Sequence, residues 1–280
     1  MVDKPAGPTS HDVVDAVRRA VGIRRVGHTG TLDPFASGLL MLLVGRATRL
    51  ARYLVGLTKT YVGTIRLGVR TDTDDRTGTV LETVDRWQSI PTEHVRAAMA
   101  SLTGHGVQLP PAYSARKTAG VPAYRRARRG EAVALEAREI EVSAFDLVSH
   151  QGSAVEFHAD VSSGTYLRAL ARDVGVELAC GAHLESLRRT SIGPFHVHAA
   201  MAFAALDLGV PSLGPPREAV PHLPTYEIDD EAFDAVRHGR PIAAPPDSDG
   251  VIALVRDHDL VAIAECQEKL LKPSVVLTRA

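Results

Sequence analysis

The segment GHTGTLDPFASG, residues 27–38, has the residue types and spacing most suited to chemistry. It holds three glycines, two threonines, a histidine and the pair Asp33-Pro34. Glycines let the backbone approach a ligand closely, and a residue that precedes proline is held out of helical geometry. We therefore expect Asp33 to present its carboxylate from a constrained loop. On composition alone, however, most Asp-Pro turns of this kind are structural.

The sequence lacks the spacings of the common nucleotide and metal sites. Neither GxGxxG nor GxxxxGK[ST] occurs, and the 12 histidines include no HExxH pair. The cysteines, Cys180 and Cys266, are far apart and have no CxxC pattern, which argues against a thiolate zinc site and a disulfide framework. We expect no metal, no cofactor and a reducing cytoplasm.

Charge is distributed unevenly along the chain, although the net charge is only −1. From Tyr226 onward 11 acids and 6 bases give −5, so residues 1–225 carry +4. The stretch from Tyr113 to Gly130 has six basic residues and no acid. Such a cluster attracts phosphates, but a solvated helix face explains it equally well.

Several elements are predicted to position the segment around Asp33. Thr9, Asp12 and Gly22 bracket an apolar pattern and predict a capped helix. In YVGTIRLGV, residues 61–69, the period-two pattern turns Tyr61 toward the core with its apolar neighbours. VEFHADV, residues 155–161, alternates more clearly and predicts a half-buried strand.

The segment SSGTYLRALARDVG, residues 162–175, is typical of a tight turn that enters a helix. Leu167, Leu170 and Val174 would face the core, which leaves Arg168 and Arg172 together on one flank at i, i+4 spacing. Strands and helices mix without regular βαβ alternation, so we predict an α+β fold.

Five prolines fall between Pro211 and Pro224 and predict a linker. The acidic remainder, about residues 225–280, contains one helical stretch and apolar runs typical of strands at Val251–Val255 and Leu260–Ala264. It would form a small mixed domain. The longest apolar run, Leu39–Val44, is far too short to span a membrane, and the amino terminus lacks the regions of a signal peptide.

Six blocks of sequence resemble, in order, the motifs of the bacterial tRNA pseudouridine synthase B family. They are DKPAGPTSHDVV at 3–14, GHTGTLDPFASGLL at 27–40, KTYVGTIRLG at 59–68, PPAYSARKTAGVPAYRRARRG at 110–130, SSGTYLRALARDVG at 162–175 and LRRTSIGPF at 187–195. Family members usually carry several more residues, forming a first strand, before the lysine that Lys4 matches. We therefore expect a shortened amino-terminal strand or sheet edge, and the native start could lie upstream of Met1.

The resemblance implies a pseudouridine-synthase-like catalytic domain at 1–210, built on a mixed, mostly antiparallel sheet with flanking helices. A basic RNA-gripping insertion would occupy about 109–137, and a small PUA-like α/β accessory RNA-binding domain 225–280. The implied activity is isomerisation of uridine to pseudouridine at position 55 in the T-loop of tRNA, with a tRNA-folding chaperone activity beside it. The target base would be flipped out of its stack, at a cost of a few kcal/mol.

The resemblance also implies roles for individual residues. Asp33 would be the nucleophile, by attack on the sugar carbon or through a glycal route, with Arg168 pairing with its carboxylate and Tyr61 stacking on the base. His28 would contact the rearranged T-loop, Tyr166 and Leu187 would line the uracil pocket, and Lys4 would lie near the site. Taken alone, Tyr61, Tyr166 and Leu187 also fit an ordinary core, Arg168 and Lys4 a solvated surface, and His28 a turn. Phosphate contacts would come from Arg116, Lys117, Arg125, Arg126, Arg128 and Arg129.

Two other classes of function remain open from the sequence. One is a catalytically silent RNA chaperone that uses the same surface. The other is a hydrolytic nucleosidase, which would normally need two carboxylates, whereas the motif offers only Asp33. We expect a cytoplasmic monomer with tRNA as its partner, no membrane association and no obligate protein partner.

Overall fold

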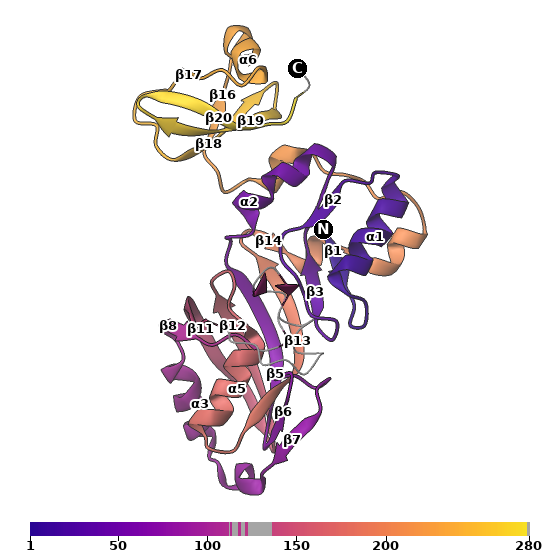
Figure 1. Cartoon of the computed structure of the whole chain (residues 1–280), viewed down its shortest axis with the longest axis vertical. Helices are drawn as coiled ribbons and strands as arrows, with labels where there is room; N and C mark the ends of the chain where they lie inside the picture. Colours follow the sequence, from indigo (N-terminus) through magenta and orange to yellow (C-terminus); the bar gives the residue numbers. More distant parts are fainter. Residues whose placement is uncertain (112, 114–116, 119–120, 123–135, 279–280) are drawn as a thin grey trace.

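The computed structural model describes residues 1–111, 113, 117–118, 121–122 and 136–278. Within them the chain is α+β, as expected, and one large sheet runs through most of its length (Figure 1). Nine of the described strands form this sheet. In sheet order they are β15 (Met201–Ala202), β1 (Val2–Lys4), β3 (Ser37–Leu40), β13 (Ala182–Ile192), β5 (Lys59–Leu67), β12 (Ala154–Val161), β11 (Arg138–Gln151) and β8 (Gly104–Gln108), with β14 (Phe195–His196) paired to β13.

The large sheet is mixed and mostly antiparallel. Within this sheet, only the β1–β15 and β3–β13 pairs of the described strands are parallel. At the amino terminus the three-residue strand β1 lies between β15 and β3. Short two-stranded ladders accompany the sheet: β2 (Val26–His28) with β4 (Leu42–Val44), β6 (Val69–Thr71) with β7 (Val80–Thr83), and β9 (Lys117–Thr118) with β10 (Val121–Pro122).

Helices α3 (Thr92–Ser101) and α5 (Leu167–Glu177) cover one face of this sheet (Figure 1). The alternation in residues 155–161 is confirmed, since the apolar side chains of β12 are buried in a core shared with both helices. Leu167, Leu170 and Val174 enter this core as predicted, and so does Tyr61 of β5. The site can therefore form where the amino end of α5 reaches the sheet.

Helix α1 (Ser10–Val21) has the caps that the sequence predicted. The backbone N–H of Asp12 donates to the Thr9 hydroxyl at 3.0 Å, and the N–H of Thr9 donates to the Asp12 carboxylate at 2.7 Å. Gly22 ends the helix in the left-handed conformation, at φ 67°. The valines of α1 pack on β1 and β3, which fixes the chain that leads into residues 27–38.

Strand register brings three of the motifs side by side. Arg189 of β13 lies opposite Tyr61 of β5 on one side and opposite Gly38 of β3 on the other. Gly38 has φ +106°, and a Cβ there would lie 2.2 Å from the Arg189 carbonyl oxygen. Only glycine allows this approach, so the last glycine of the segment 27–38 is required by packing.

A second sheet follows the proline-rich stretch 211–224, whose described structure includes only a short 3-10 helix, Pro216–Ala219. Its strands, in sheet order, are β16 (Thr225–Glu227), β18 (Val251–Arg256), β19 (Asp259–Gln267), β20 (Leu270–Val276) and β17 (Ile242–Ala243), with helix α6 (Asp230–Arg237) beside them. This sheet shares an apolar core with the 3-10 helix Gly45–Leu50 and with α2 (Ala51–Leu54) (Figure 1). Arg46 also donates to the carbonyl of Leu277 at 3.1 Å.

Candidate active site

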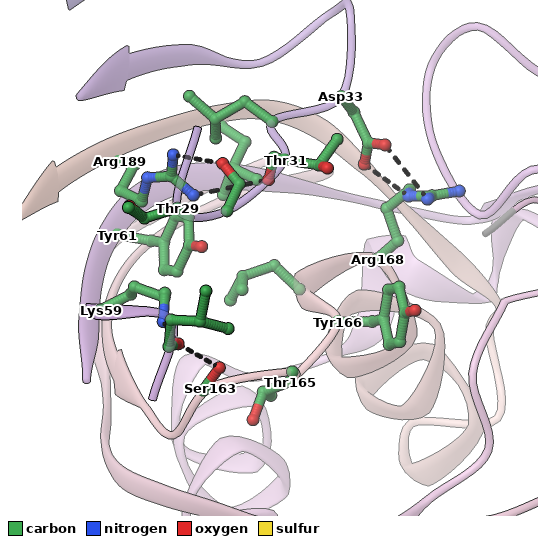
Figure 2. A pocket seen from close by; sticks show the side chains of 16 residues that line it. Thr29, Thr31, Asp33, Lys59, Tyr61, Ser163, Thr165, Tyr166, Arg168 and Arg189 are labelled. Carbon is green, nitrogen blue, oxygen red and sulfur yellow. Dashed lines mark hydrogen bonds and ion pairs between the residues drawn. The ribbon is translucent and has the colours of Figure 1, made fainter. Parts of the chain in front are cut away.

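The loop that carries Asp33 forms one wall of a cavity of about 260 Å³ (Figure 2). Strands β5 and β13 and the turn into α5 supply the other walls. The lining residues are Thr29, Gly30, Thr31, Leu32, Asp33, Val55, Lys59, Tyr61, Ser163, Gly164, Thr165, Tyr166, Leu167, Arg168, Leu187 and Arg189. Five of the residues that the sequence singled out are among them, namely Asp33, Tyr61, Tyr166, Arg168 and Leu187.

The two oxygens of the Asp33 carboxylate bind the guanidinium of Arg168 (Figure 2). Arg168 Nε lies 2.9 Å from Asp33 Oδ2, and Nη2 donates to Oδ1 at 3.3 Å. The Arg168 side chain is 5% exposed, so it does not occupy the solvated flank that helical periodicity suggests. A two-point ion pair of this kind fixes the direction of the carboxylate as well as its charge.

Further contacts hold the Arg168 guanidinium in place. Nη1 donates to the carbonyl of Thr73 at 3.0 Å, and Nη2 donates to the carbonyl of Tyr113 at 2.8 Å. The buried carboxylate of Asp75 lies 3.7 Å from Nη1 and accepts hydrogen bonds from the hydroxyls of Thr73 and Thr77. Asp75 does not line the cavity, so it steadies the arginine from behind.

Burial is the main influence on the ionisation of Asp33. Desolvation raises the pKa of this carboxyl above its usual range, the Arg168 charge opposes that rise, and the Asp75 charge adds to it. Arg168 is thus the main group that favours the ionised form of Asp33. A carboxylate held in this way is a suitable nucleophile, because it is charged, directed and only one-third exposed.

Tyr61 stands on the cavity wall and is 6% exposed. Leu187 and Tyr166 lie on the same lining, and Tyr166 immediately precedes α5. These side chains give the cavity two aromatic rings and an aliphatic surface beside the carboxylate. Such a lining suits a flat, neutral ring such as a nucleobase.

Lys4 lies beneath the site with no exposed surface. Its ammonium donates to the carbonyls of Pro5 and Pro8, each at 2.8 Å, and to that of Pro34 at 3.3 Å. Burial lowers the pKa of Lys4 to about 8, although the nearby Asp33 charge raises it. Lys4 thus ties the amino-terminal turn to the residue that follows Asp33, rather than lying solvated.

His28, on β2, does not line the cavity. Its Nδ1 accepts a hydrogen bond from the N–H of Gly30 at 3.3 Å. Burial lowers the pKa of His28, and the charges of Arg189 and His11 lower it further. The imidazole is therefore neutral and is positioned beside the loop 29–33.

Most of the basic insertion lies outside the described residues, including Arg116, Arg125, Arg126, Arg128 and Arg129. Lys117 belongs to β9, which pairs antiparallel with β10. The phosphate contacts expected of all six basic residues stay a prediction.

Three side chains that the sequence patterns did not single out complete the site. Arg189, only 1% exposed, donates to the carbonyls of Leu39, Thr31 and Gly30 and so supports the loop of Asp33. Lys59 lines the cavity, and Asp75 lies behind Arg168. Lys59 and Arg189 stand inside the blocks KTY and LRRTSIGPF, which could have pointed to them, whereas Asp75 lies in an acidic turn outside every block.

Comparison with known proteins decides the family. A model of the TruB family pseudouridylate synthase (N terminal domain) matches residues 18–167, more than half of the chain. The chain belongs to the TruB pseudouridylate synthase family. A model of the tRNA pseudouridylate synthase B C-terminal domain matches the TruB chain at residues 168–208.

Relatives match this TruB chain over nearly its whole length. The tRNA pseudouridine synthase B of Mycobacteroides abscessus is 41% identical, covering 100% of this chain and 95% of its own. That of Thermobifida fusca is 44% identical, covering 99% and 97%. A solved structure entitled "Crystal Structure of a Cbf5-Nop10-Gar1 Complex" contains a chain with 28% identity and a TM-score of 0.74, covering 99% of this chain and 83% of its own. The fold predicted from the resemblance is thereby confirmed.

Among the described residues, no helix is long and apolar enough to cross a membrane. This finding fits the short apolar runs of the sequence.

Proposed function

We propose that this chain isomerises uridine to pseudouridine in tRNA, with position 55 of the T-loop as its target. Full-length relatives named tRNA pseudouridine synthase B support the reaction and the substrate. The observation that carries the proposal is the two-point ion pair of Asp33 with Arg168 on a cavity lined by Tyr61. The ion pair supplies a charged, directed nucleophile, and the cavity can hold the flipped base.

The reaction must break the C1′–N1 bond of the target uridine and form a C1′–C5 bond. Asp33 either adds to C1′ or removes a proton from C2′, and the bonding electrons pass to the uracil ring in both routes. The detached uracil then turns so that C5 faces C1′. In the first route C5 bonds to C1′ as the Asp33–C1′ bond breaks, and in the second C5 bonds to C1′ of the glycal as Asp33 returns the proton to C2′. Loss of the proton on C5 then completes pseudouridine in both routes. Tyr61, Tyr166 and Leu187 hold the base during this turn, while Arg168 keeps Asp33 directed at the sugar.

The cavity favours isomerisation over hydrolysis. Asp33 is the one carboxylate among the described residues that line it. Asp75 is turned toward Arg168 and would not activate a water on the opposite face of the sugar. Glycoside hydrolysis normally uses two carboxylates that flank the bond, so water has no comparable base here.

Incubation with an unmodified T-arm stem-loop, followed by assay of pseudouridine and free uracil, tests the proposal. We expect pseudouridine without uracil release from the native chain and none from Asp33→Asn. Release of uracil would instead indicate a hydrolase. Binding without either product, unchanged in Asp33→Asn, would indicate an RNA chaperone.

We also propose that the basic insertion binds RNA phosphates and that the sheet of residues 225–276 is an accessory RNA-binding unit. The protein is proposed to act as a monomer in the cytoplasm. Charge reversal of Arg125, Arg126, Arg128 and Arg129 should weaken RNA binding and flatten its dependence on salt, because each lost phosphate contact lowers the slope by about 0.7–0.9. Unchanged affinity at every salt concentration would reject this role.

A further inference from the structure

Lys59 and Arg189 lie across the cavity from Asp33 and Arg168 (Figure 2). Both are buried, with 6% of Lys59 and 1% of Arg189 exposed. They are also neighbours, because a Cβ placed on Gly30 would lie 3.6 Å from Arg189 Nη1 and 3.8 Å from Lys59 Cε. The cavity therefore has a carboxylate–guanidinium pair at one side and two cations at the other.

No carboxylate of the described residues forms an ion pair with either of these two cations. Arg189 donates to the main-chain carbonyls that support the loop of Asp33. The Lys59 ammonium donates to the carbonyls of Val55 at 2.8 Å and Leu57 at 2.5 Å. An ammonium has three N–H groups, so the described contacts leave one for a ligand.

Two adjacent buried charges of the same sign are costly without an anion beside them. Burial and the Arg189 charge together lower the pKa of Lys59 to about 8. The direction is the expected one, because both effects disfavour the charged ammonium. A second feature of the same wall is the Thr29 hydroxyl, which is buried and has no hydrogen-bond partner in the described part of the chain. This side of the cavity is therefore built to receive a negatively charged or strongly accepting ligand.

The proposed reaction generates such a ligand inside the cavity. Breaking the C1′–N1 bond leaves a uracil anion whose charge is shared among N1 and the two carbonyl oxygens. Lys59 stands two residues before Tyr61 on the same face of β5, and the two side chains line the cavity together. A base stacked on Tyr61 would thus have an oxygen edge beside the ammonium.

We propose that Lys59, with Arg189 behind it, forms a subsite that binds the detached uracil anion, the Lys59 ammonium donating a hydrogen bond to a uracil oxygen. This inference rests on the proposed function and adds to it a catalytic residue and a ligand. Positioned donors of this kind stabilise charge that develops in the transition state. The same contact retains the base while it turns, which explains why uracil is isomerised rather than released.

The test compares Lys59→Met with the native chain on a T-arm stem-loop, using single-turnover rates at saturating RNA and separate measurement of the RNA Kd. We expect Lys59→Met to slow glycosidic cleavage about 100- to 1,000-fold and to change the Kd by less than threefold. Lys59→Arg, which keeps the charge, should recover part of the rate. If the native chain forms no pseudouridine, the proposed function fails; if it does and Lys59→Met cleaves equally fast, only this inference fails.

A second substrate separates catalysis from a structural role. With 5-fluorouridine at the target position, fluorine itself stabilises the uracil anion, so the loss in cleavage rate on Lys59→Met should be at least tenfold smaller. Lys4→Met is the matched control, since Lys4 is also a buried lysine but lies off the cavity. Any loss it causes should be the same for both substrates. An equal loss on both substrates in Lys59→Met would overturn the inference, and a raised Kd with unchanged cleavage would show a phosphate contact instead.

Discussion

Replacing Arg168 by lysine keeps the positive charge but removes the planar, two-point contact with Asp33. The native guanidinium makes two contacts with the carboxylate and donates to the carbonyls of Thr73 and Tyr113. These partners lie on three separate segments. A lysine ammonium is a single point with three donors and cannot reach all of them from one position.

The expected loss follows from the contacts that are given up. At least one charge-assisted hydrogen bond to Asp33 disappears, which is worth about 1.5–3 kcal/mol, and a buried carbonyl loses its donor at a cost of about 1–3 kcal/mol. If about 3 kcal/mol of this total falls on the transition state, the single-turnover rate drops at least 100-fold. The free energy of unfolding should fall by the remainder.

Arg172→Lys is the matched control for this measurement. Arg172 lies one turn further along α5 and pairs with Asp74 at 3.3 Å, and it has no described contact with Asp33. The control should lose stability but keep the native rate within about threefold, since neither Arg172 nor Asp74 lines the cavity. A native rate in Arg168→Lys, or an equal slowing in Arg172→Lys, would refute the reasoning.

Three further outcomes are expected. Because burial raises the pKa of Asp33 and the reaction needs its ionised form, activity should fall on acidification at a pH above the ordinary aspartate pKa of about 3.9; a single-turnover pH profile checks this, and full activity down to pH 4 would contradict it. Gly38→Ala should lower the free energy of unfolding by at least about 2 kcal/mol in a denaturant titration, because a Cβ there meets the Arg189 carbonyl and strains the backbone. Gln108→Leu should cost about 2–4 kcal/mol and slow the reaction, because the buried Gln108 amide pairs with both the N–H and the C=O of Tyr166 at the start of α5; an unchanged unfolding midpoint would exclude this role.

Local patterns predicted the elements well. The capping of α1, the inward side of β5 and β12 and the apolar face of α5 are short-range properties, set by periodicity and by residues within one turn of each other. Arg168 could not be placed in this way. Its spacing on α5 predicts a flank, and only the packing of the helix end against the loop of Asp33 turns that flank into the cavity wall.

Contacts between residues distant in sequence could not be predicted from local patterns either, because they too depend on how the elements pack. Lys4 looks like a solvated residue near the chain end, yet it is buried because three proline carbonyls from two segments converge on it. Asp75 has no motif, and its contact with Arg168 depends on a turn 93 positions earlier in the sequence. Such contacts follow from the tertiary fold. The family resemblance placed Lys4 near the site, because Lys4 lies in a motif block, but it gave no signal for Asp75.

Buried cations explain how a loop rich in glycine holds a fixed shape. Arg189 donates to Gly30 and Thr31, Lys4 donates to Pro34, and Arg168 binds Asp33 itself. The loop therefore depends on donors from β13, β1 and α5, all of which lie outside residues 27–38. The glycines allow the backbone of the loop to approach a substrate closely. The hydrogen bonds from the buried donors hold the loop in one conformation, although glycines have more backbone conformations to lose than other residues. The charges of Arg168 and Lys4 also oppose the rise in the pKa of Asp33, so two of the contacts that shape the loop favour the charged carboxylate that the proposed reaction uses.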